Sequence, residues 1–194
     1  MGSSEVTAAK TSLRRDLLAR RSRHTDAERA SIAATLAAAF ATEFESRIRG
    51  GSAPDKPMRV VAVYLSFATE PGTGPLIQWL ADQRVRALAP TLLPDADLGW
   101  MDVPDGPPLG LDAITDAEVI LVPALAVDLS GHRLGRGGGS YDRALTRVQP
   151  GQTVLAVVHD HEVLDSVPFE SHDRIVDGAL TPSGVRYFGI AADG

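Results

Sequence analysis

The residues best suited to chemistry lie together in one stretch, residues 128–143. Four of the five positions from 135 to 139 are glycine, Arg136 is the fifth, and Arg133 shortly precedes them. Glycines let backbone N–H groups close on an anion, and guanidinium groups form forked hydrogen bonds suited to phosphate or carboxylate. Asp142 follows, and carboxylates are ligands that Mg²⁺ accepts beside phosphate and water. The stretch predicts a site for a phosphate-bearing ligand.

Two common nucleotide-binding motifs do not fit this stretch. No Gly-Lys-Ser/Thr follows the glycines, so it is not a P-loop, and Ser140 occupies the third glycine position of the dinucleotide fingerprint. A glycine cluster alone is also typical of a flexible turn. The two arginines and the predicted strand-loop-helix context favour the phosphate site.

The elements around the stretch give that context. Residues 119–122 form an apolar, β-branched run that predicts a buried strand, and a helical pattern begins at Tyr141 and includes Leu145 and Val148. Open α/β sheets bind ligands at the carboxyl ends of their strands, and a helix N-terminus favours an anion. We therefore expect the glycine loop at the ligand-binding edge of a sheet.

The first 49 residues predict a pair of helices. Leucines form an apolar stripe over 13–18, and Thr25 and Glu28 have the spacing of a capping box. Apolar residues then recur every four positions over 32–48, as in a long amphipathic helix seated on a core. Residues 50–54 (Gly-Gly-Ser-Ala-Pro) end this helix and predict a flexible connector.

The remainder alternates between strand and helix patterns. Further strands are expected at 60–65, 85–89, 153–158 and 185–190, a helix around 76–80, and a loop over 93–117. Such alternation predicts a mostly parallel α/β sheet with helices on both faces. We expect one domain spanning residues 1–194, with the N-terminal helical pair packed on the sheet.

Composition narrows the function classes. The 194 residues carry a formal net charge of -6 and a pI near 5.3, which argues against a protein that coats nucleic acid. The absence of cysteine excludes disulfides, thiolate zinc sites and cysteine nucleophiles. No secretory signal or apolar span long enough for a bilayer is visible. We expect a cytoplasmic monomer without membrane or nucleic-acid partners.

The glycine-arginine stretch and three other segments resemble the signature of the 5-formyltetrahydrofolate cyclo-ligase (5,10-methenyltetrahydrofolate synthetase) family. Besides 122–128 and 131–142, the matching residues are Lys10, Leu13, Arg14, Tyr64, Leu65, Ser66, Glu70, Thr73, Val167, Pro168, Glu170, His172, Asp173, Val176 and Asp177. The resemblance spans nearly the whole chain. It implies a three-layer α/β domain similar to the NagB/RpiA/CoA-transferase fold. It also implies the cyclisation of 5-formyltetrahydrofolate to 5,10-methenyltetrahydrofolate, with ATP and magnesium, and with reduced folate and ATP as small-molecule partners.

The resemblance also implies roles for individual residues. The nucleotide-binding set would be Lys10, Arg14, Arg133, Leu134, Gly135, Arg136, Gly137, Gly138, Gly139, Ser140 and Tyr141. The folate-binding set would be Leu65, Glu70, Arg136, Gly137, Gly138, Gly139 and Ser140. Arg136, Gly137 and Asp142 would act at the reacting groups, and Asp142 and Asp173 would hold magnesium.

The sequence departs from the family pattern in the segment between Trp100 and Asp116, which is shorter than usual and lacks a Glu-Pro pair. This leaves open a catalytically weakened protein of the same fold that binds folate and ATP, or an unrelated small-molecule kinase on a similar sheet. Trp79 is expected in the core, and Trp100, in the expected loop, is the candidate for a ring-stacking surface. The histidines lack the HExxH spacing of a zinc site.

Overall fold

The computed structural model describes residues 3–49 and 58–189. The connector expected at 50–54 lies outside the described residues. None of the described helices is both long and apolar enough to cross a membrane. In chain order the elements are α1 (Ser3–Arg21), α2 (Asp26–Ile48), β1 (Val60–Ala62), α3 (Gly74–Asp82), β2 (Arg86–Leu92), β3 (Leu98–Asp102), β4 (Pro108–Gly110), the 3₁₀ helix η1 (Asp112–Asp116), β5 (Val119–Pro123), β6 (Ala126–Asp128), β7 (Arg133–Leu134), α4 (Ser140–Ala144), η2 (Leu145–Arg147), β8 (Thr153–Val157), η3 (Asp160–Glu162), β9 (Val163–Leu164), β10 (Gly178–Thr181) and β11 (Gly184–Tyr187).

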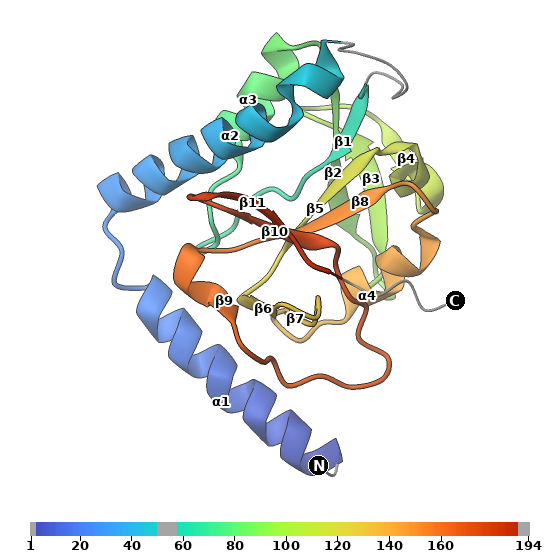
Figure 1. Cartoon of the computed structure of the whole chain (residues 1–194). Helices are drawn as coiled ribbons and strands as arrows, with labels where there is room; N and C mark the ends of the chain where they lie inside the picture. Colours follow the sequence, from blue (N-terminus) through green and yellow to red (C-terminus); the bar gives the residue numbers. More distant parts are fainter. Residues whose placement is uncertain (1–2, 50–57, 190–194) are drawn as a thin grey trace.

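The main sheet has the strand order β11-β10-β8-β5-β1-β2-β3-β4 (Figure 1). The five strands from β10 to β2 are parallel, and antiparallel strands extend the sheet at both edges. The chain moves from β1 to β2 on one side and later returns to β5 on the other side. Neighbouring β1 and β5 therefore form the switch point at which such sheets bind ligands. The expected mostly parallel α/β architecture is confirmed.

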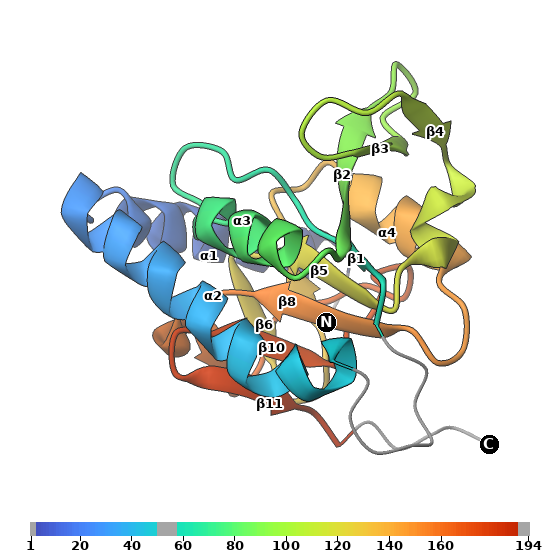
Figure 2. The same cartoon turned by 90° about the horizontal axis from the view of Figure 1, so that it is seen from above.

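Helices cover both faces of this sheet because side chains of each buried strand point alternately to either side. In β5, Val119 and Leu121 face the core under α2 and α3, whereas Ile120 and Val122 face the core under η1, α4 and η2. Figure 2 shows α2 and α3 next to each other over the sheet. The capping box expected at the start of α2 is present: the Glu28 N–H donates to the Thr25 hydroxyl, and a Glu28 carboxylate oxygen accepts from the Thr25 N–H.

α1 packs elsewhere, against the small sheet β7-β6-β9 (Figure 1). Its apolar stripe, with Leu17 at the centre, meets Leu125, Leu134 and Val167. This contact places the other residues of the same helix beside the loops that follow β5 and β9. Of the two N-terminal helices, α2 therefore covers the main sheet and α1 covers its ligand-binding edge.

The expectation of a loop over 93–117 is wrong. That segment forms β3, β4 and η1, and β3 pairs with β2 in antiparallel register from Leu88↔Asp102 to Leu92↔Leu98. Trp100 consequently faces the core with 1% of its surface exposed, and it is no ring-stacking surface. Trp79 is partly buried and packs edge-on against Phe40, in agreement with its expected core position.

Other boundaries also differ from expectation. β1 ends at Ala62 rather than at 65, because the buried Tyr64 turns away: its carbonyl accepts from the Thr73 hydroxyl, and its own hydroxyl donates to the Pro71 carbonyl. The strand expected at 185–190 is the shorter strand β11, and the strand β10 that precedes it was not expected. The helix after the glycine loop has only five residues before it tightens into η2, which leaves little helix dipole to favour an anion.

Candidate active site

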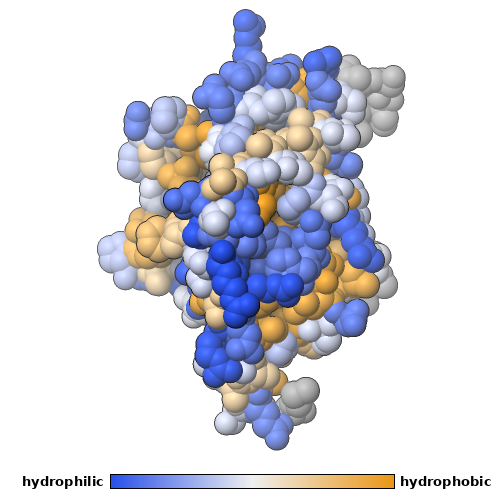
Figure 3. All heavy atoms as spheres, turned by 90° about the vertical axis from the view of Figure 1, so that its left-hand side faces the viewer, coloured by the Kyte–Doolittle hydropathy of each residue, from blue (hydrophilic) through white to orange (hydrophobic). Residues whose placement is uncertain are grey.

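One cavity of about 600 Å³ opens at the carboxyl edge of the main sheet. It lies beside α1, the glycine loop, the ends of β2 and β5, and the loops that follow β1 and β9. Its lining residues are Thr7, Lys10, Arg14, Arg21, Glu70, Leu92, Leu98, Pro123, Ala124, Leu125, residues 133–142, Glu170, His172 and Asp173. Figure 3 shows the face on which α1 lies, with hydrophilic residues gathered across its middle and hydrophobic residues around them. All the expected site residues except Leu65 line this cavity.

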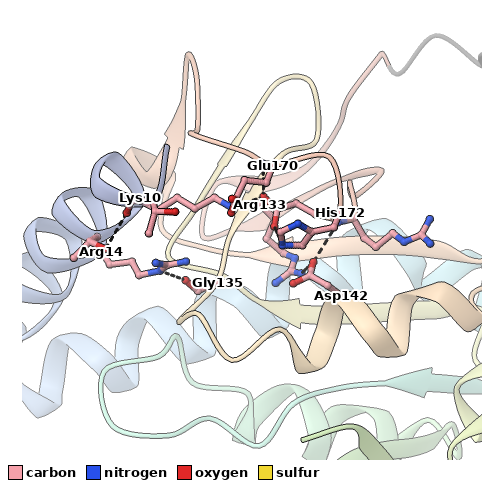
Figure 4. Close-up of polar contacts among 11 residues, drawn as sticks. Lys10, Arg14, Arg133, Gly135, Asp142, Glu170 and His172 are labelled. Carbon is pink, nitrogen blue, oxygen red and sulfur yellow. Dashed lines mark hydrogen bonds and ion pairs between the residues drawn. The ribbon is translucent and has the colours of Figure 1, made fainter. Parts of the chain in front are cut away.

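The glycine loop is held against α1. The Arg14 Nε donates to the Gly135 carbonyl oxygen at 2.9 Å (Figure 4). Gly137 has φ +104°, in the region that favours glycine, and a Cβ at this position would lie 3.5 Å from the Arg14 guanidinium carbon. Gly137 therefore lets the loop turn while it stays in contact with a fixed guanidinium group.

Lys10 supplies a buried ammonium group to the site. It is 5% exposed, and its Nζ lies 2.9 Å from Glu170 Oε2 and 2.6 Å from Asp173 Oδ2. Burial acts to lower the pKa of Lys10, but the hydrogen bonds to the two carboxylates outweigh it, so the pKa is raised. Burial likewise acts to raise the pKa of Asp173, and the Lys10 ammonium and the Glu170 N–H lower it overall. Both groups are charged at neutral pH.

Arg133 and Asp142 form a second ion pair at the cavity wall. The Arg133 Nη2 lies 2.6 Å from Asp142 Oδ1, and the same oxygen accepts from the Arg174 N–H at 3.2 Å. The second bond ties Asp142 to the segment that contains Asp173 (Figure 4). The two carboxylates expected to hold magnesium therefore belong to neighbouring parts of one wall.

Arg136 and Glu70 form a third pair, across the cavity. The Arg136 Nε lies 3.0 Å from Glu70 Oε1, and the other oxygen of Glu70 accepts from the Phe67 N–H. The pair joins the loop after β1 to the glycine loop. Leu65 lies in the first of these loops but is 54% exposed and does not line the cavity.

The carboxylates fit a magnesium ion only together with a ligand. Among the described residues no three histidine or acidic side chains gather closely enough to form a metal site by themselves. Mg²⁺, however, is commonly held by one or two carboxylates, with water and substrate phosphates completing its six ligands. Asp142 and Asp173 can supply such a pair, because both face the cavity that contains the cationic residues.

Arg21 is a cavity residue that the sequence analysis missed. It ends α1, is 1% exposed, and forms a bidentate ion pair with Glu162 at 2.7 and 2.6 Å. Its Nη2 also donates to the carbonyl oxygen of Ala124, directly after β5. The signal was present in the spacing, since Arg21 follows Arg14 by seven positions and so lies on the same face of the helix.

Comparison with known proteins agrees with these features. The family model described as the 5-formyltetrahydrofolate cyclo-ligase family matches residues 6–182. The chain is 40% identical to a 5-formyltetrahydrofolate cyclo-ligase of Mycolicibacterium smegmatis over 143 residues, which cover 64% of this chain and 74% of the relative. It is 34% identical to the Escherichia coli K12 protein of that name over 148 residues, covering 64% of this chain and 79% of the relative.

Two solved structures share the fold. A 5,10-methenyltetrahydrofolate synthetase from Mycoplasma pneumoniae aligns with a TM-score of 0.73 at 17% identity, covering 88% of this chain and 97% of that one. The enzyme of the same name from Aquifex aeolicus aligns with a TM-score of 0.72 at 24% identity, covering 95% and 94%. These structures show the shared fold. The family match over residues 6–182 and the 40% identical relative show that the chain belongs to the 5-formyltetrahydrofolate cyclo-ligase family.

Proposed function

We propose that this protein uses ATP to cyclise 5-formyltetrahydrofolate to 5,10-methenyltetrahydrofolate, with release of ADP and phosphate. Membership of the family supports the reaction. The observation that carries the proposal is that three cationic side chains of one cavity, those of Lys10, Arg133 and Arg136, each lie in an ion pair with a carboxylate. Such a site can exchange its internal carboxylates for the anionic groups of a ligand.

The nucleotide phosphates would lie between α1 and the glycine loop. Lys10 and Arg14 are four positions apart on one face of α1, so both can converge on one triphosphate. Residues 133–141 would surround the phosphates from the opposite side, where glycines permit close approach of the backbone. Arg14 already contacts that loop through Gly135, which supports this placement.

The reduced folate would lie beside Glu70 and the residues from Arg136 to Ser140. A carboxylate can accept hydrogen bonds from the N–H groups of the pterin ring, and Glu70 has such a carboxylate facing the cavity. Leu65, on the exposed part of the same loop, would contact the folate from outside the cavity. The formyl group would then lie next to the phosphates.

The chemistry requires an amide-like oxygen to become a leaving group. The formyl oxygen attacks the γ-phosphorus, the bond to ADP breaks, and an imidate phosphate results. N10 then attacks the formyl carbon and loses its proton, and the C–O bond breaks to release phosphate. Phosphoryl transfer depends mainly on positioning and charge neutralisation, which Arg136, the Gly137 backbone and the cations of α1 would supply. Magnesium, held by Asp142 and Asp173, would add positive charge at the phosphates.

A steady-state assay tests the proposal. Purified protein is mixed with ATP, magnesium and 5-formyltetrahydrofolate, and the ultraviolet absorption band of the methenyl product is followed together with ADP release. We expect one ADP for each ring closed and no product when ATP is omitted. Saturable binding of both ligands without product would instead indicate the weakened binding protein, and a phosphorylated product without ring closure would indicate a kinase.

A further inference from the structure

One buried donor of the cavity wall is not accounted for by these roles. Arg21 Nη1 is buried and has no hydrogen-bond partner among the described residues, although Nε and Nη2 of the same guanidinium are fully used. Leaving a buried donor unsatisfied costs free energy, so such groups call for an explanation. Arg21 lines the cavity, so a ligand that displaces the atoms now covering Nη1 can supply the missing acceptor.

The position of Arg21 along α1 indicates which ligand. It lies seven residues beyond Arg14 on the same helix face, which corresponds to about 10 Å along the axis. Figure 4 shows Arg14 pointing to Gly135 of the glycine loop and Lys10 pointing to Glu170. Both come from the part of α1 at which the phosphates are expected. Arg21 therefore lies about two helical turns further along α1 than Arg14, away from the expected position of the phosphates.

The end of α1 at Arg21 lies beside the switch point of the sheet. Arg21 donates to Ala124, which follows β5, and Glu70 belongs to the loop that follows the neighbouring parallel strand β1. Burial raises the pKa of Tyr64, which also follows β1; the charge of Glu70 raises this pKa further, and that of Arg21 lowers it. The Tyr64 hydroxyl donates to the carbonyl of Pro71, the residue after Glu70, so this phenol lies next to the Glu70 loop. A carboxylate acceptor and a guanidinium donor therefore line the cavity after the two strands of the switch point.

We propose that Arg21 is a folate-binding residue whose Nη1 donates a hydrogen bond to the lactam carbonyl oxygen of the pterin ring, while Glu70 accepts from the adjacent ring N–H. A lactam presents a donor and an acceptor side by side, and this pair of side chains complements both. The inference rests on the proposed function, since it names the contact that orients its substrate. In this arrangement α1 contacts both ligands: its first half binds the nucleotide, and its last residue binds the folate.

The test compares Arg21→Lys with Glu162→Gln. Lysine keeps a positive charge near Glu162 but has a single nitrogen, which cannot serve Glu162, Ala124 and a ligand together. Glu162→Gln weakens the ion pair yet keeps all nitrogens of Arg21, and Glu162 does not line the cavity. All proteins are assayed well below their melting temperatures. We expect Arg21→Lys to raise the KM for folate at least about tenfold and to leave the KM for ATP within about twofold, and Glu162→Gln to change neither by more than about twofold.

A substrate analogue tests the lactam edge as a whole. In a 4-amino analogue an amino group replaces the carbonyl and the adjacent ring nitrogen loses its hydrogen, so a donor faces Arg21 and an acceptor faces Glu70. The wild type should bind it at least about tenfold more weakly than the 4-oxo compound, and Arg21→Lys should lose part of this preference. Should Arg21→Lys not fold, the double variant Arg21→Gln/Glu162→Gln, which has no buried charge at either position, replaces it.

Two results would overturn the inference: equal folate KM values for Arg21→Lys and Glu162→Gln, or a loss confined to ATP. Calorimetric binding of 5-formyltetrahydrofolate separates this inference from the proposed function. A wild type that binds folate but forms no methenyl product would refute the reaction, and the binding constants of the variants would still decide the role of Arg21.

Discussion

The Glu162→Gln substitution has a consequence for stability that follows from the burial of its ion pair. The side chains of Arg21 and Glu162 are 1% and 0% exposed, and Glu162 also accepts from the His159 N–H at 2.8 Å. Glutamine keeps the shape and one acceptor oxygen, but it removes the negative charge and brings an N–H₂ group toward donors. Breaking a buried pair from one side costs about 3–5 kcal/mol, and the retained oxygen favours the lower end of that range.

For a chain of this size, 1 kcal/mol shifts the melting temperature by about 2–4 °C, so we expect a fall of about 6–12 °C. Calorimetry or circular dichroism at neutral pH measures it. The matched control is Asp16→Asn, which breaks an exposed pair with Arg15 and should shift the melting temperature by less than about 2 °C. The double variant Arg21→Met/Glu162→Leu should recover much of the loss, because an apolar pair needs no desolvation. A single variant as stable as the control would refute the reasoning.

Three further predictions concern separate parts of the molecule. Arg136→Ala and Asp142→Asn should each lower kcat/KM for methenyl formation by about a hundredfold or more while the protein stays folded, and near-normal rates in both would exclude the glycine loop as the active site. Thr25→Ala should cost about 1 kcal/mol of stability through the lost cap and leave the kinetics unchanged; an altered kcat would contradict the purely structural role given to this turn. Burial lowers the pKa of His159 to about 4, so the unfolded chain takes up more protons between about pH 6.5 and 4. Stability should therefore fall by up to about 3 kcal/mol as the pH drops through this window, and His159→Gln should flatten that fall in denaturant titrations; an unchanged slope would show that His159 is not its source.

Local patterns predicted the parts of the fold in which sequence and burial coincide. The parallel strands at 119–122 and 153–158 are buried on both faces and read as continuous apolar runs, and the capping box at Thr25 is a property of four consecutive residues. The edge strands β3 and β4 were missed because Gly99, Asp102 and Pro108 interrupt any apolar pattern. β3 pairs with β2 and β4 pairs with β3, each across a short loop.

In the candidate site, too, local patterns reveal some features and leave others hidden. The glycine-arginine stretch has a distinctive local composition, so its residues could be selected from the sequence. Its ion pairs could not, because Lys10 meets Asp173 and Arg136 meets Glu70 only through the folded sheet. Arg21 has the helical spacing that places it on the face of Arg14, but its burial depends on Glu162, a residue 141 positions later.

Segments far apart in the sequence close the cavity, which has a consequence during synthesis on the ribosome. Arg21 emerges 141 residues before Glu162, and Lys10 emerges 160 and 163 residues before Glu170 and Asp173. Until translation has passed residue 173, α1 lacks at least one of these carboxylate partners and the wall beside the glycine loop is incomplete. A nascent chain therefore cannot acquire the finished cavity by stages from its N-terminus, and a message truncated before codon 173 yields a polypeptide without it.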